Sequence, residues 1–135
     1  MPLNYKQNGK NFEDIFLPRS YTTLDQQTIP NSFNSTLYAW GDNTGGKLAQ
    51  NDITPRSSPV QIGSLTGWIN WCGTYHVAAV RGDGTLWTWG INTYGELGDN
   101  TIIHRSSPVQ IGSLTNWLQV ETCYFNTTSA IKTCL

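Results

Sequence analysis

A unit of about 49 residues occurs twice in this 135-residue chain, and this repeat limits what the chain can fold into. Residues 36–41 (TLYAWG) align with residues 85–90 (TLWTWG), and residues 57–66 and 106–115 both read SSPVQIGSLT. A fixed period of this length is the signature of propellers and solenoids, in which a single unit cannot bury a core alone. The sequence therefore predicts repeats that share a hydrophobic core with their neighbours.

The residue pattern within the repeat predicts four short strands separated by turns. The clearest hairpin joins residues 76–81 to residues 85–90, because the Asp-Gly step between them supplies the positive φ angles of a tight turn. Residues 68–73 predict a third strand, and residues 58–62 predict a short outer strand. Pro59 is tolerated there only if the strand lies at a sheet edge or if the proline stands at its start.

Four short antiparallel strands per unit, repeated radially, describe the blade of a β-propeller. The matching motifs are DGTLWTWG at 83–90, Gly-x-Asn-x-x-Gly-x-Leu at 90–97, RSSPV at 105–109 and Gly-x-x-His at 73–76. Through them residues 36–135 resemble the regulator of chromosome condensation repeat family. The resemblance implies propeller blades; for the founding member it implies a seven-bladed ring that promotes nucleotide exchange on a small GTPase and sits on chromatin. Many relatives are only binding scaffolds, so the activity does not transfer with the fold.

We therefore expect an all-β fold with an N-terminal arm, 1–35, followed by two four-stranded propeller repeats, 36–84 and 85–135. The second copy stops where a TLWTW strand would follow, and the first copy opens with that strand at Thr36. The two ends then read as complementary halves of one blade. Propellers need roughly four to eight blades to close a circle, so we expect the missing strands to come from another chain.

We expect the ring to close by homo-oligomerisation, with a trimer of about six blades favoured over a dimer or a tetramer. The residues predicted to join the chains are Thr36, Leu37, Trp40, Ala130 and Ile131. A fragment of a longer protein or a frameshifted C-terminus are the alternatives for the same pattern.

The tryptophans predict packing between blades. Four of the six recur at equivalent repeat positions, Trp40 with Trp89 and Trp68 with Trp117, which favours a structural role over ligand binding.

The titratable residues favour a protein that is not an enzyme and has no cofactor or metal. His76 and His104 are not reproduced between the copies and have no nearby paired carboxylate or nucleophile, so we expect structural or surface histidines. The aspartates lack the alternating spacing of a calcium loop. We expect them, with recurring asparagines, to shape turns: Asp42, Asp52, Asp83, Asp99, Asn43, Asn51, Asn92 and Asn100.

Composition excludes several classes of partner. Eight basic and nine acidic residues nearly cancel without a basic run, which argues against nucleic-acid binding. No segment approaches the roughly 18 apolar residues of a membrane span, and residues 1–11 do not read as a signal peptide. Cys72, Cys123 and Cys134 have no CxxC spacing, so neither a zinc site nor a disulfide framework is expected.

The arm carries one apolar cluster, and we expect it to tether the protein to another one, the alternative being an arm without fixed structure. The predicted anchors are Phe12, Ile15, Phe16 and Leu17. An arm followed by an oligomeric head of low charge resembles the layout of bacteriophage fibre, collar or decoration proteins. The sequence thus favours a non-enzymatic structural or adhesion protein of a virion, contacting virion proteins and a host surface glycan or protein. The alternatives are a cytoplasmic propeller adaptor or small-GTPase regulator, and a carbohydrate-binding head that uses exposed aromatics such as Tyr94.

Deleting residues 1–34 is expected to leave the β-rich head folded, because no repeat strand is removed. Far-ultraviolet circular dichroism of the truncated protein checks this expectation. Precipitation of the truncated protein, or loss of its β-sheet signal, would show that the arm belongs to the core.

Overall fold

The computed structural model describes residues 6–7, 10–11, 34–123 and 126–134 of the chain, which divides into two units, Met1–Pro30 and Asn31–Leu135. In the first unit, β1 (Lys6–Gln7) and β2 (Lys10–Asn11) pair antiparallel. The predicted arm anchors lie outside the described residues; they are Phe12, Ile15, Phe16 and Leu17.

The described residues of the second unit form eight strands and one short 3-10 turn, η2 (Thr44–Gly46). The strands are β3 (Tyr38–Gly41), β4 (Arg56–Gln61), β5 (Trp68–Gly73), β6 (His76–Arg81), β7 (Leu86–Gly90), β8 (Arg105–Gln110), β9 (Trp117–Cys123) and β10 (Thr127–Lys132). Each sequence repeat contributes four of them. The all-β, propeller-type prediction is confirmed.

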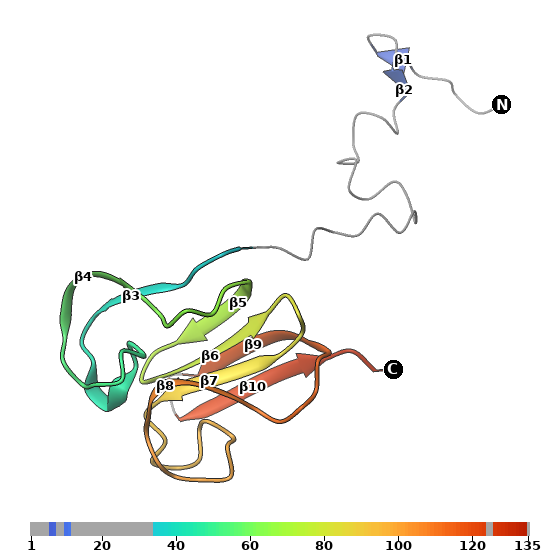
Figure 1. The fold of residues 1–135 in the computed structure, drawn as a ribbon. Helices are drawn as coiled ribbons and strands as arrows, with labels where there is room; N and C mark the ends of the chain where they lie inside the picture. Colours follow the sequence, from blue (N-terminus) through green and yellow to red (C-terminus); the bar gives the residue numbers. More distant parts are fainter. Residues whose placement is uncertain (1–5, 8–9, 12–33, 124–125, 135) are drawn as a thin grey trace. The chain divides into compact units, whose positions relative to one another are not determined.

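The strands form three antiparallel sheets, and the sheets are offset from the sequence repeats by half a unit (Figure 1). The order β5-β6-β7-β8 makes one complete blade, which takes two strands from each repeat. Strands β3 and β4 pair as an N-terminal half-blade, and β9 and β10 pair as a C-terminal half-blade. The outer strands β4 and β8 carry Pro59 and Pro108, because an edge strand can accept a residue that has no N–H to donate.

The complete blade is organised around β6, which is covered on both faces. Ala79 belongs to a core cluster shared with the N-terminal half-blade, whereas Ala78 and Val80 belong to a cluster shared with the C-terminal half-blade. Alternate residues of a strand point to opposite faces, so the two half-blades lie on opposite faces of the complete blade. This double burial explains the continuous run of small apolar residues in β6.

The β6–β7 hairpin turns at the predicted Asp-Gly step, with a positive φ at Gly84 but not at Asp83. Asp83 Oδ1 accepts hydrogen bonds from the Thr85 backbone N–H at 3.0 Å and from the Thr85 hydroxyl at 2.6 Å. Gly84 has φ of +78°, and a Cβ at this position would collide with the carbonyl oxygen of Thr115. The turn therefore needs glycine both for its backbone conformation and for close packing against the chain leading to β9.

A buried asparagine closes the long loop of each repeat. The Asn92 side chain is fully buried; its amide group donates to the carbonyl oxygens of Thr101 and Ile103, and its Oδ1 accepts from the Leu97 N–H at 3.0 Å. Asn43 makes the equivalent bonds in the first repeat. These side chains replace the regular backbone pairing that an irregular buried loop lacks.

Replacing Asn92 by Ala is expected to lower the free energy of unfolding by about 1–3 kcal/mol, because the buried Leu97 N–H loses its acceptor. Urea unfolding followed by circular dichroism measures this change. Thr93→Ala, an exposed neighbour in the same loop, is the matched control and should be nearly neutral. Equal stability of the two variants would contradict the role given to Asn92.

Candidate functional site

The contact between the N-terminal half-blade and the complete blade is centred on one tryptophan. The Trp89 side chain is fully buried against Leu37 and Ile62 of the half-blade, and its Nε1–H donates to the Lys47 carbonyl oxygen at 3.0 Å. Its ring meets that of Trp68 edge to face, with centroids 5.9 Å apart. Trp89 and Trp68, two of the residues predicted to pack blade against blade, thus lie where the N-terminal half-blade meets the complete blade.

At the contact between the complete blade and the C-terminal half-blade, no tryptophan of the described residues takes the place that Trp89 has at the first contact. Val120 is buried against Ala78 and Val80, and its backbone N–H donates to Asn70 Oδ1 at 2.9 Å. Trp117 packs against the same cluster and is half-buried. A cavity of about 440 Å³ remains between the two sheets. Its lining includes Leu86, Glu96, Gly98, Ile111, Trp117 and Ala130.

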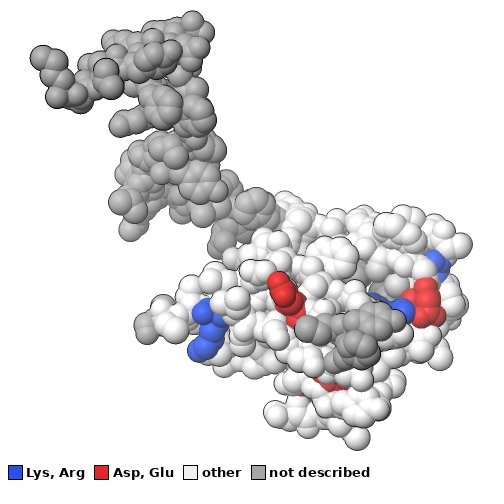
Figure 2. Space-filling view, turned by 180° about the vertical axis from the view of Figure 1, so that it is seen from behind, with Lys and Arg blue, Asp and Glu red and all other residues white. Residues whose placement is uncertain are grey.

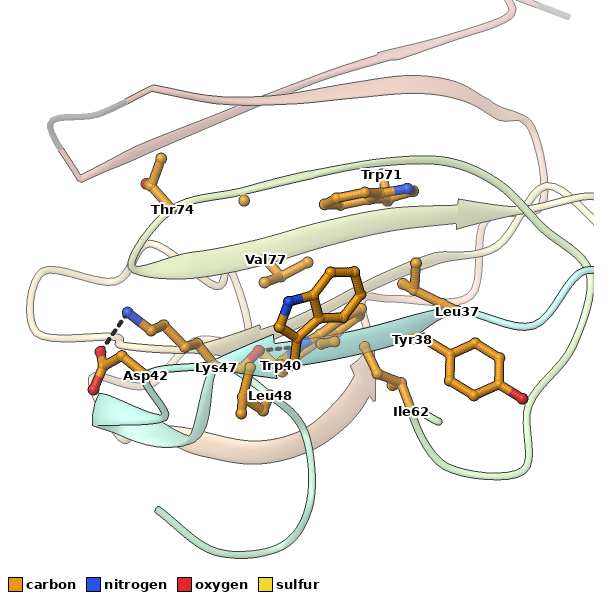
Figure 3. Close-up of a pocket in the computed structure, with 13 residues that line it drawn as sticks. Leu37, Tyr38, Trp40, Asp42, Lys47, Leu48, Ile62, Trp71, Thr74 and Val77 are labelled. Atoms are coloured by element: carbon orange, nitrogen blue, oxygen red, sulfur yellow. Dashed lines mark hydrogen bonds and ion pairs between the residues drawn. The ribbon is translucent and has the colours of Figure 1, made fainter. Parts of the chain in front are cut away.

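A second cavity, of about 400 Å³, opens beside the N-terminal half-blade, where aromatic side chains gather (Figure 3). Tyr38, Trp40 and Trp71 line it and are exposed, Trp40 by 61% and Trp71 by 57%. Lys47 is directed toward Asp42, with an Nζ to Oδ2 distance of 2.6 Å (Figure 3). The surface is apolar with one charged pair at its border, which suits protein contact better than binding of a charged small ligand.

The predicted inter-chain residues fall on the two half-blades. Thr36 and Trp40 are exposed and Leu37 is buried on the N-terminal side, whereas Ala130 is half-buried and Ile131 exposed on the C-terminal side. Because the half-blades lie on opposite faces of the complete blade, the single chain does not pair these two groups with each other.

Trp71 is a surface residue that sequence reasoning missed. Its repeat equivalent is Val120, so this tryptophan does not recur and the repeat pattern does not mark it. The signal that could have found it is strand pairing: Trp71 is opposite Ala79 just as Val120 is opposite Ala130.

Both histidines are held in structural hydrogen bonds, as predicted. His76 is buried, and its Nε2 lies 2.9 Å from the Thr128 hydroxyl, which in turn donates to the Glu96 carbonyl oxygen at 2.7 Å. Burial lowers the pKa of His76, and the nearby Glu96 charge opposes this effect only in part. His104 Nδ1 accepts a hydrogen bond from the Asn92 backbone N–H at 3.0 Å.

The aspartates shape turns, also as predicted. Asp52 Oδ1 accepts from the Thr54 N–H at 2.9 Å, and Asp99 Oδ1 accepts from the Thr101 N–H at 3.0 Å. A hydrogen bond from the Arg56 side chain, together with the Thr54 N–H, holds the pKa of Asp52 below its ordinary value. In the part of the chain that the structure describes, no group of three His, Cys, Asp or Glu side chains is arranged to hold a metal ion. No helix there is long and apolar enough to span a bilayer.

Comparisons with known proteins agree with this architecture. The family model for the Regulator of chromosome condensation (RCC1) repeat matches residues 34–80 and 83–127. The crystal structure of human WBSCR16 is similar in fold, with a TM-score of 0.59 and 20% sequence identity over 67% of this chain. The chain spans 25% of that structure's chain. No curated protein matched it in sequence.

Acidification is expected to destabilise the protein through His76. The pKa of His76 in the folded protein lies below its unfolded value of about 6.5. The neutral His76 side chain therefore contributes fully to stability above a pH of about 6.5, and this contribution is lost as the pH falls through the folded-state pKa. His76→Gln keeps an N–H donor for Thr128 but does not titrate, and it should flatten this part of the stability profile.

Urea unfolding between pH 7.5 and pH 5 measures the effect, with His104→Gln as the control for the other histidine. An unchanged pH slope in His76→Gln would contradict the assignment.

Proposed function

We propose, from the premise that the chain belongs to the RCC1 repeat family, that this protein is a non-enzymatic structural or adhesion subunit of a virus particle, of fibre, collar or decoration type. The observation that carries the proposal is the pair of half-blades, each of which has an unpaired strand edge and exposed apolar side chains among the described residues. Surfaces of this kind favour assembly with other protein chains.

The polar groups of the head support a structural role. Among the described residues of the head, four ion pairs lie within or beside loops, and three of them join an aspartate to an arginine. The buried asparagines and His76 hold loops and strands in place. Groups used in this way stabilise a rigid scaffold and leave little chemistry for turnover.

The surface also agrees with a protein partner. Figure 2 shows one face on which charged side chains are few, and at one side of it blue and red side chains adjoin. Such a surface lacks the concentrated positive charge that attracts nucleic acid or anionic lipid. In this proposal the arm attaches the protein to the particle, and the propeller head faces outward toward other virion proteins or a host surface glycan or protein.

The arm makes the proposal testable. Replacing Phe12 and Phe16 together by Ser is expected to weaken the affinity for purified particles by several orders of magnitude, since each buried Phe contributes about 2–3 kcal/mol. Co-sedimentation with the particles measures this affinity. Phe33→Ser, the same change outside the anchor cluster, is the control and should bind like the unchanged protein.

Two results would overturn the proposal. One is absence of the unchanged protein from purified particles, measured by immunogold labelling. The other is accelerated release of labelled nucleotide from a panel of small GTPases, which would assign the protein to the regulator class.

A further inference from the structure

Three large apolar side chains are exposed in the single chain although their repeat equivalents are buried. The exposed residues are 57–61% accessible, and their equivalents are 0–2% accessible. The pairs, with the exposed residue first, are Trp40 and Trp89, Trp71 and Val120, and Ile131 and Val80. A repeat places equivalent residues in equivalent surroundings, so a sheet is missing beside each exposed residue.

The buried equivalents show what kind of sheet would cover them. Trp89 is covered by Leu37 and Ile62 of a β3–β4 pair, and Val80 is covered by Val120 of a β9–β10 pair. The exposed apolar surface of each half-blade therefore has the shape that accepts another blade of the same repeat. A second copy of this chain carries such sheets.

A socket for Trp40 is already present in the chain. The socket of Trp89 consists of Leu37, Ala49, Ile62 and the Lys47 carbonyl oxygen. The residues 49 positions later are Leu86, Gly98, Ile111 and Glu96, and all four line the cavity of about 440 Å³. This cavity lies where the C-terminal half-blade meets the complete blade, and no indole from the described residues fills it.

The register of strand pairing in the complete blade also indicates how strands β10 and β3 could pair. In the complete blade, Val77 is opposite Trp89 and Ala78 is opposite Thr88. The equivalent residues on β10 are Thr128 and Ser129, and those on β3 are Trp40 and Ala39. Among the described residues, β10 pairs only with β9 and β3 pairs only with β4, so both strands have an edge ready for this register.

We propose that the C-terminal half-blade of one chain and the N-terminal half-blade of a second copy form one hybrid blade, in strand order β9-β10-β3-β4. Thr128 then lies opposite Trp40 of the second copy, whose indole fills the cavity and donates its N–H to the Glu96 carbonyl oxygen. That oxygen already accepts the Thr128 hydroxyl, and a carbonyl oxygen can accept two hydrogen bonds. Because each copy offers both halves, the contact is head-to-tail and closes as a ring, with three copies giving about six blades.

The proposal does not depend on the virion role. A ring in solution that is absent from particles would refute only the proposed function, whereas particle binding by a single chain would refute only the hybrid blade.

Disulfide trapping tests the register. In a Cys134→Ser background, which removes an exposed thiol, mixing Ala39→Cys chains with Ser129→Cys chains should give disulfide-linked dimers under mild oxidation. Directly opposed strand residues lie within the Cα separation that a disulfide needs. Each variant alone should stay unlinked, and so should Ala39→Cys mixed with Lys132→Cys. No link in the first mixture, or equal linking in the Lys132→Cys mixture, would overturn the proposal.

Truncating Trp40 tests the socket. Trp40→Ala should weaken self-association by about 100-fold or more in sedimentation, as for a central interface tryptophan, without changing circular dichroism, because Trp40 is exposed in the single chain. Ile53→Ala is the matched control: Ile53 and its repeat equivalent Ile102 are both exposed, so its association should be unchanged. Equal association of the Trp40→Ala and Ile53→Ala proteins would overturn the socket.

Discussion

The buried indole of Trp89 joins the repeats of this protein. It fills the space between the N-terminal half-blade and the complete blade, and its N–H satisfies a loop carbonyl of the preceding repeat unit. The cluster around it also contains Trp68 and Ala79 of the complete blade, with Val77 and Trp87 packed against it. Trp40 is the repeat equivalent of Trp89, and in the single chain it is 61% exposed.

The half-unit offset between repeat and sheet explains why the chain has an incomplete blade on each side of the complete one. A blade in this chain is completed by strands from two successive repeats, so the sheet of each blade crosses a repeat boundary. Among the described residues, the same rule leaves β3 and β10 each with one unpaired strand edge, and it leaves Trp40 and Ile131 exposed. Backbone groups at a sheet edge and large exposed apolar side chains both favour association. The physical features that build the head from its repeats thus also predict how copies of it would combine.

Much of the fold could be predicted from the sequence because its determinants are local. The Asp83-Gly84 turn and the alternating strands predict the β6–β7 hairpin, and Pro59 predicts an outer strand. The predicted outer strand, 58–62, is displaced from β4, because the edge position lets the strand begin before the proline. The candidate site was predicted less completely. Trp71 is not repeated, and the bond between His76 and Thr128 depends on packing of the C-terminal half-blade, whose register is shifted by a two-residue insertion.

The mass of the assembled protein is the most direct measure of the hybrid blade. Light scattering coupled to size exclusion, run over a range of protein concentrations, reports this mass without a label or a substitution. The account predicts a species of three times the 15.0 kDa chain mass that persists on dilution. A monodisperse species with the mass of a single chain at every concentration would contradict it.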